Sequence, residues 1–197
     1  QLLTAAAGIA ASLGISVAAP APALGASRPR NWPARDVGPF DSFRDYVKAL
    51  EDRGLVMRVK RLDQDQYEMT ALTYKLMDEF GWYDAPTLLV EEIRQDGRWL
   101  KGPVITNHQG HWDTEAIIWG REPIPGQGPE TYRETIKFLL EGAEARDGKT
   151  PSIPTNPVPA DKAPIKEVIL RGEQCNVLDF AFIKSNPSQP ARSRPLT

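Results

Sequence analysis

The sequence predicts a mixed α/β (α+β) fold for residues 40–145. Three observations support this class: helical and strand-like apolar patterns alternate along the chain, glycines and prolines separate them, and 41% of the residues are hydrophobic, which allows a core of ordinary size. A length of 197 residues suffices for one domain and part of another. The expected order of elements is helix, strand, helix, strand, strand, helix, helix, followed by a proline-rich crossing into further strands.

The first expected unit is a helix that runs into a strand. Ser42 and Asp45 have the spacing of a capping box at a helix start. Four apolar residues behind them share one helical face: Phe43, Tyr46, Val47 and Leu50. Gly54 is suited to end the helix with a positive φ angle, and the apolar run 55–59 predicts a strand directly after it.

The middle of the chain predicts a second helix and several strands. Residues 67–80 carry apolar side chains at helical spacing, and Gly81 ends the pattern. The apolar run 87–91 predicts a buried strand. Asp96-Gly97 predicts a tight turn into a second arm around Trp99 and Leu100, and residues 103–107 predict another strand.

Two helices and a proline-rich segment are expected next. Residues 114–120 predict a short helix stopped by a glycine, and residues 132–145 predict a longer one. The inward face of the longer helix is expected to carry Tyr132, Ile136, Leu139, Leu140 and Ala143. Four prolines forbid regular structure over residues 146–163, which are expected to be a linker or an extended wrap. The apolar runs 165–170 and 180–183 predict strands that open the next unit.

The start of the chain has the composition of an export signal. Residues 1–26 form an alanine-rich, weakly hydrophobic run that ends in small residues, as a bacterial signal and its cleavage site do. Its modest hydrophobicity is typical of twin-arginine signals rather than of a stable membrane span, and the diagnostic arginine pair would precede Gln1. A disordered Ala/Pro tail is the alternative. The segment predicts export to the periplasm, with a cytoplasmic location left open, and residues 27–39 predict a linker.

Charge and cysteine content exclude several classes of protein. The net charge is −2 and no basic block occurs, so nucleic acid is not an expected partner. Cys175 is the sole cysteine, which excludes an intrachain disulfide and a cysteine metal cluster within the chain. We expect it to be a small, partly buried apolar residue. The sequence also lacks the GxSxG, P-loop, HExxH and CxxC motifs.

A few residues could bind a metal or a phosphate, and each of them also has a simpler structural interpretation. His108 and His111 could present two imidazoles to a metal, but Gly110 lies between them and a surface loop is the expected structure. Gly126 and Gly128 precede a helix, where phosphate binds in some proteins, yet a proline-rich loop fits better. Two pairs of glutamates are expected to be solvated charges: Glu91 and Glu92, and Glu141 and Glu144. The sequence therefore predicts no catalytic residue and no metal ligand.

Three segments resemble the UbiD family of decarboxylases, and together they cover roughly residues 40–187. Asp41–Val59 is similar to the family's opening pattern LREFLxxLExxGELxRV. Gly102–Asn107, with the helix that ends at Gly120, resembles the segment PVxxNxxG…G. Pro164–Gly172 resembles PVKEVVLxG, which leads into the flavin-binding domain, and it is the most specific of the three.

The resemblance implies an enzyme that removes or adds a carboxyl group with prenylated FMN as electron sink. The implied substrates are aromatic or α,β-unsaturated carboxylic acids. A divalent metal, with K⁺ in some members, would help to hold the cofactor phosphate, and Glu and Arg side chains would handle protons. Residues 164–187 would then be the first strands of a split-barrel flavin-binding domain, and the intact enzyme would be a homo-oligomer.

The sequence departs from the family pattern after residues 185–187. The tail 188–197 contains no glycine and no aromatic residue, where the family continues with a glycine-rich turn and a tyrosine. No residue of this chain matches the family's site, so no catalytic or cofactor-binding residue is assigned. The loop 184–186 either approaches the site of a complete enzyme or is a plain turn. We expect the chain to be a fragment, inactive and without tightly bound flavin; the alternative is a non-catalytic, exported binding or interaction module.

Overall fold

The computed structural model describes residues 37–149 and 157–184. The chain divides into two units by its contacts. Of the described residues, 37–135 and 181–184 form the first unit, and 136–149 and 157–180 form the second. The expected leader (1–26) and tail (188–197) lie outside the described residues, as do most of the first linker and part of the second.

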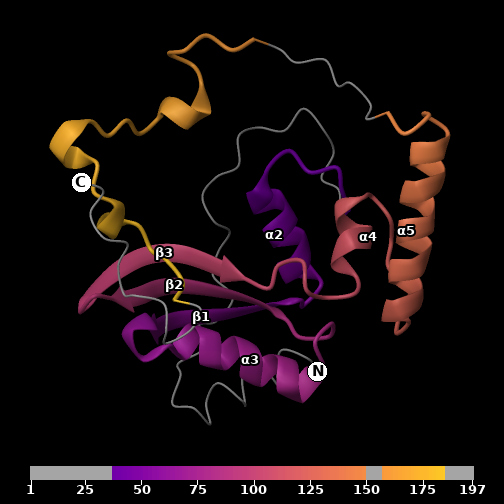
Figure 1. Ribbon diagram of the computed structural model, residues 1–197, viewed down its shortest axis with the longest axis horizontal. Coiled ribbons are helices and arrows are strands. Elements are labelled where there is room, and N and C mark those ends of the chain that lie inside the picture. Colours follow the sequence, from indigo (N-terminus) through magenta and orange to yellow (C-terminus); the bar gives the residue numbers. More distant parts are fainter. Residues whose placement is uncertain (1–36, 150–156, 185–197) are drawn as a thin grey trace. The chain divides into compact units, whose positions relative to one another are not determined.

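A three-stranded sheet with helices on both faces forms the first unit (Figure 1). Its strands, in the spatial order β1-β2-β3, are β1 (Val56–Asp63), β2 (Thr87–Gln95) and β3 (Arg98–Thr106). β1 and β2 run parallel, whereas β2 and β3 run antiparallel. The predicted mixed α/β class is thereby confirmed, while the split barrel has no counterpart among the described residues.

Helix α2 (Phe43–Asp52) begins and ends as its sequence predicts. The Asp45 amide donates to the Ser42 hydroxyl at 3.3 Å, and that hydroxyl donates to the Asp45 carboxylate at 2.9 Å. Gly54, at φ 73°, donates to the Glu51 carbonyl at 2.9 Å and so closes the last turn. Phe43 is the least buried of the four apolar residues expected to share one helical face. It lies in the first turn, 51% exposed, with its ring edge-on to His108.

Helix α3 (Glu68–Phe80) connects the parallel strands β1 and β2 and packs on one face of the sheet. A short 3-10 helix, η1 (Gln64–Gln66), comes before it, and Tyr67 joins the two at φ 59°. The core on this face is apolar and fully buried, and includes Met57, Val59, Leu62, Met69, Leu72, Leu76, Leu88, Val90 and Ile93. Burial of this size is the main favourable term in folding such a unit.

The second face of the sheet is covered by α2 and by α4 (Thr114–Ile118). Its core contains Tyr46, Val47, Ala49, Leu50, Leu55, Val56, Leu89 and Ile117. Arg58 of β1 is also buried here, at 6% exposure, and its guanidinium pairs with Glu51 and, at 3.5 Å, with Glu91. A buried charge of this kind is tolerated because carboxylates accompany it.

Strands β2 and β3 form one hairpin, whereas the sequence predicted a short arm and a separate strand. Asp96 and Gly97, at φ 51° and 75°, make the predicted two-residue turn. The register shifts beside Val90, and β3 continues through this irregularity rather than stopping. Gly102 allows the close approach there, since a Cβ on it would lie 2.8 Å from the Val90 carbonyl oxygen.

Helix α5 (Gly128–Glu144) buries a different face from the predicted one. Its buried residues are Thr131 and Thr135, whereas Tyr132 and Leu140 are 39% and 59% exposed. The Thr131 hydroxyl accepts a hydrogen bond from the Ile124 amide at 2.9 Å. Contacts of the first helical turns therefore set the buried face, and apolar spacing alone predicted it wrongly.

The two strands expected after the proline-rich segment do not form. The apolar run 165–170 contains the end of η2 (Pro164–Lys166) and then irregular backbone, and Ile165 is 89% exposed. Two further 3-10 turns follow, η3 (Gly172–Gln174) and η4 (Val177–Asp179). No described strand pairs with either run, and an extended segment without a ladder partner has no strand hydrogen bonds to stabilise it.

No helix in the described part of the chain is both long enough and apolar enough to cross a membrane.

Candidate functional site

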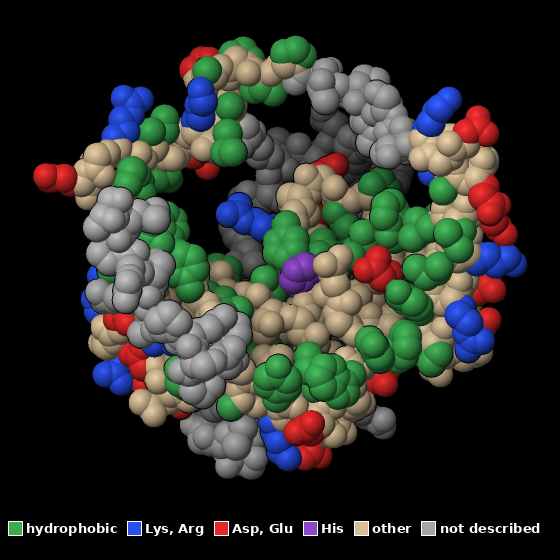
Figure 2. All heavy atoms as spheres, in the orientation of Figure 1, with side chains coloured by type: hydrophobic (Ala, Val, Ile, Leu, Met, Phe, Trp, Pro, Cys, Tyr) green, Lys and Arg blue, Asp and Glu red, His purple; other side chains and the backbone are tan. Residues whose placement is uncertain are grey.

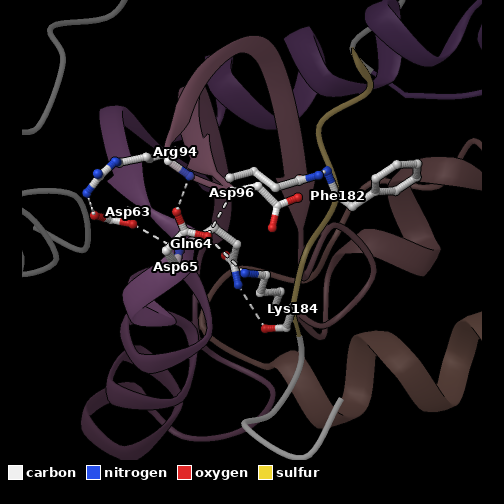
Figure 3. A network of polar contacts seen from close by, with 9 residues as sticks. Asp63, Gln64, Asp65, Arg94, Asp96, Phe182 and Lys184 are labelled. Carbon is white, nitrogen blue, oxygen red and sulfur yellow. Dashed lines mark hydrogen bonds and ion pairs between the residues drawn. The ribbon is translucent and has the colours of Figure 1, made fainter. Parts of the chain in front are cut away.

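The strongest cluster of polar contacts joins the end of the described chain to the first unit. Residues 181–184, which we call the strap, lie beside η1, α3 and the end of β2 (Figure 3). The contacts join residues up to 120 positions apart in the sequence. Sequence inspection singled out Lys184 only as part of the loop 184–186, which either approaches the site of a complete enzyme or is a plain turn, and it singled out none of the partners of Lys184.

The turn around η1 positions the acidic partner of the strap. The Asp63 carboxylate accepts the Asp65 amide at 2.9 Å, and Glu68 accepts the Asp63 amide at 2.5 Å. Asp63 is further paired with Arg94 of β2 at 2.9 Å. Since these bonds fix both ends of the 3-10 turn, the side chain of Asp65 is held in one direction, toward the hairpin turn and the strap.

Asp65 binds three donors. Its two carboxylate oxygens accept the backbone amides of Asp96 and Gly97, each at 2.8 Å, and Oδ1 also accepts the Lys184 ammonium at 2.9 Å. Burial by itself would raise the pKa of Asp65, but the hydrogen bonds from Lys184, Gly97 and Asp96 outweigh it and hold the pKa at about 2. The same hydrogen bond raises the pKa of Lys184. Both groups are therefore charged across the neutral range.

The backbone of the strap is held by neutral side chains. The Lys184 carbonyl accepts hydrogen bonds from the Gln64 amide at 2.9 Å and the Thr70 hydroxyl at 2.6 Å. The Phe182 amide donates to the Gln95 side-chain oxygen at 2.9 Å. Gln64 is fully buried, so its amide would be costly to leave unpaired. Gln64, Thr70 and Gln95 thus recognise main-chain groups of the strap, whereas Asp65 binds the Lys184 side chain.

A pocket of about 190 Å³ adjoins the strap. Its lining residues come from α3, the loop after it, β3 and the strap: Met69, Thr70, Thr73, Tyr74, Met77, Trp82, Thr106 and Ile183. None of them carries a charge. Tyr74 and Trp82 are more than half exposed and meet edge to face with ring centroids 6.4 Å apart. The pocket therefore suits an apolar group and offers no counter-ion to a carboxylate.

The loop with His108 and His111 is a turn, as predicted, but the two imidazoles have separate surroundings. The Gly110 amide donates to the Asn107 carbonyl at 3.2 Å. His108 lies edge-on to Phe43, and its carbonyl accepts the Tyr46 hydroxyl. Figure 2 shows a histidine exposed between hydrophobic side chains on this face. The Nδ1 atom of His111 instead accepts the amide of Asp113 at 3.1 Å, and its side chain is only 12% exposed.

The pKa shifts of the side chains around this loop favour their neutral forms. Burial lowers the pKa of His111 and raises the pKa of Asp113, whose carboxylate lies 3.8 Å from the imidazole. Burial and the nearby Glu115 carboxylate raise the pKa of the Tyr46 hydroxyl. Within the described ranges, no three His, Cys, Asp or Glu side chains form a group that could hold a metal ion. His108 and His111 therefore lie in the same loop but have different neighbours.

The remaining sequence candidates also have structural explanations. Gly128 packs against Trp112, whose ring atom lies 2.6 Å from where a Cβ would be, so close packing accounts for this glycine. Glu92 and Glu91 are not solvated charges as expected, because they pair with Arg61 at 2.5 Å and with Arg58 at 3.5 Å. Glu141 and Glu144 are exposed, as predicted. The partial burial expected for Cys175 is wrong, because this residue is exposed.

No family model matches the chain, and no solved structure matches it. The described residues define a mixed α/β unit to which the strap is bound by hydrogen bonds.

Proposed function

We propose that this chain is the N-terminal portion of a UbiD-like carboxy-lyase, which reversibly decarboxylates aromatic or α,β-unsaturated acids with prenylated FMN. The support is the resemblance of three segments in one order along the chain. The first of them covers α2 and the first half of β1, which form consecutive elements of one unit. The second covers the end of β3, in the same sheet.

The contacts of the strap with η1, α3 and β2 are the structural observation that best supports this proposal. In the resemblance, residues 164–187 lead into a split-barrel flavin-binding domain. In the structure, the end of that segment is held by Gln64, Asp65 and Thr70. The α/β unit would then fix the point from which the flavin-binding domain continues. Export to the periplasm and homo-oligomer formation belong to the same proposal.

The described residues supply no site for the implied metal. Their acidic and histidine side chains form no group of three that could hold one. The carboxylates near the strap are already committed, because Asp65 accepts three hydrogen bonds and Asp63 pairs with Arg94. We propose that the divalent metal, K⁺ and prenylated FMN would bind in the part of an intact enzyme that follows residue 187.

Flavin binding by two versions of the protein tests the proposal. The first is this chain, and the second extends it through the downstream reading frame, both produced with a supply of prenylated FMN. We expect near-stoichiometric flavin absorbance and decarboxylation of a panel of cinnamic, benzoic and furoic acids only in the extended protein. Stoichiometric flavin on the short chain would show that the site is not missing. Absence of flavin and of carbon dioxide release from the extended protein would remove the enzyme assignment.

The alternative is a non-catalytic binding module, which the exposed apolar pocket favours. Tyr74 and Trp82 present aromatic surface at its rim, and such surface is common at interaction sites. The module should show a single cooperative thermal transition as the 197-residue chain and should retain a specific partner in pull-downs. A Trp82→Ala variant should lose that partner while keeping the same transition.

A further inference from the structure

The strap is bound in a way that differs from every other element of the first unit. Four side chains from η1, α3 and β2 are directed at it: Gln64, Asp65, Thr70 and Gln95. Three of these contacts converge on Lys184, two at its carbonyl and one at its ammonium. The binding site is therefore built from groups of separate elements.

The strap contributes little to the apolar core. Ala181 packs against the core on the α3 side, whereas Phe182 and Ile183 are 46% and 36% exposed. No ladder of strand hydrogen bonds includes residues 181–184. Segments with few buried apolar contacts and exposed hydrogen bonds open at a lower free-energy cost than the unit as a whole. The strap therefore has the properties of an element that opens locally.

Opening of the strap changes the pocket, because Ile183 is one of its walls. The other lining residues belong to α3, β3 and the loop that carries Trp82, and among them Thr70 also donates its hydroxyl to the Lys184 carbonyl. Met69 is fully buried, and Met77 partly buried, while the strap is bound. Methionine-lined surfaces accommodate varied apolar groups when they become accessible.

We propose that the strap is a latch, fastened by Asp65 and Lys184, whose release opens the apolar pocket above α3. The inference does not rest on the proposed enzyme function, since it uses contacts within the first unit alone. In the closed state, the two bonds to the Lys184 carbonyl and the ion pair hold Ile183 against the pocket. In the open state, the pocket widens on the side that Ile183 occupied, and apolar surface of α3 becomes accessible.

Hydrogen exchange of the full 197-residue chain tests the latch. The reporter is the Phe182 amide, which is bonded to Gln95. In Lys184→Met the ion pair is lost and the apolar stem remains, so this amide should exchange about two- to fivefold faster. Amides of β2 and α3 should keep their rates. Lys184→Arg should restore most of the protection, because it keeps the charge that Asp65 binds.

An exposed ion pair on α3 provides the matched control. Lys75 pairs with Glu79 at 2.5 Å one helical turn apart, and both side chains are nearly half exposed. Lys75→Met removes the same charge as Lys184→Met, and exchange of the Phe182 amide should not change. Fluorescence of the apolar dye 8-anilinonaphthalene-1-sulfonate should rise about twofold in Lys184→Met and stay at the wild-type level in Lys75→Met.

Three outcomes would overturn the latch. Equal exchange of the Phe182 amide in Lys184→Met and Lys75→Met would show that the ion pair does not fasten the strap. A uniform acceleration over β2, α3 and the strap would show that the strap opens only when the whole unit unfolds. Faster exchange of the strap without a change in dye fluorescence would refute the claim that the strap covers the pocket.

Discussion

The apolar runs 55–59 and 165–170 both predict strands, and only the first forms one. β1 begins at Val56 within the first run and pairs with β2 over seven residue pairs. Its residues contact α2 on one face of the sheet and α3 on the other. The second run has similar composition but contains a 3-10 turn, and Val168 is 75% exposed. The comparison teaches that an apolar run becomes a strand only where a partner strand and two covering layers exist.

The largest expected difference is in how much the truncation of an apolar side chain lowers the free energy of unfolding. Leu88 of β2 is fully buried beside β1, whereas Ile169 is 53% exposed. Leu88→Ala should lower the free energy of unfolding by about 2–5 kcal/mol, because the truncated side chain leaves a cavity. Ile169→Ala should change it by less than about 0.5 kcal/mol. Urea denaturation followed by circular dichroism measures both values.

A loss above about 1 kcal/mol in Ile169→Ala would contradict this comparison, since it would place residue 169 in a cooperative core.

Two glycines with positive φ allow the two regions to be compared by the strain that an alanine would introduce into the backbone. Gly54 ends α2 at φ 73°, and Gly172 begins η3 at φ 56°. An alanine at either position is strained by roughly 1 kcal/mol, because a Cβ disfavours this region. Gly54→Ala should therefore lower the unfolding free energy of the first unit by about this amount.

Gly172→Ala serves as the control, since the same strain lies outside the cooperative unit and should leave the denaturation midpoint unchanged. Equal losses in the two variants would indicate that residues 157–180 unfold together with the sheet.

The smallest expected effect is that of pH on the stability of the bound strap. The folded pKa of Asp65 is about 2, below its ordinary value of 3.8, so the carboxylate stabilises the bound strap fully above about pH 4. This contribution is lost as the pH falls from about 4 to 2, and solvent screening limits it to less than about 1 kcal/mol. Lys184, whose pKa is raised, keeps its charge until the solution is strongly basic. Exchange of the Phe182 amide, corrected for its intrinsic pH dependence, measures the change.

Asp65→Asn should show weak protection of this amide at every pH between 2 and 7. A wild-type protein with constant corrected protection from pH 5 to pH 2 would contradict the assignment of Asp65 as the fastening group.

The sequence predicts the local features of the fold well, because their causes are local. Ser42, Gly54 and the Asp96-Gly97 turn act on the residues next to them, and all three have their predicted roles. Features that depend on distant partners were missed or wrong. The exposed face of α5 and the irregular run 165–170 were misassigned because apolar spacing does not reveal which surface is covered.

The candidate site could not be predicted for the same reason. Gln64 and Asp65 follow a strand and have the composition of an ordinary polar turn. Their shared partner, Lys184, is separated from them by about 120 residues, and no motif connects the two segments. The only signal in the sequence is that Lys184 follows Pro164–Gly172, the segment that resembles the entry into a flavin-binding domain.

The distance between Asp65 and Lys184 along the chain has a consequence during protein synthesis. A ribosome adds roughly 5–20 residues per second, so the 119 positions between them correspond to a delay on the order of ten seconds. The sheet and its helices are complete well before Lys184 is made. We expect the nascent α/β unit to fold with the Gln64 amide still hydrated, and the arrival of Lys184 to be the last step that completes it.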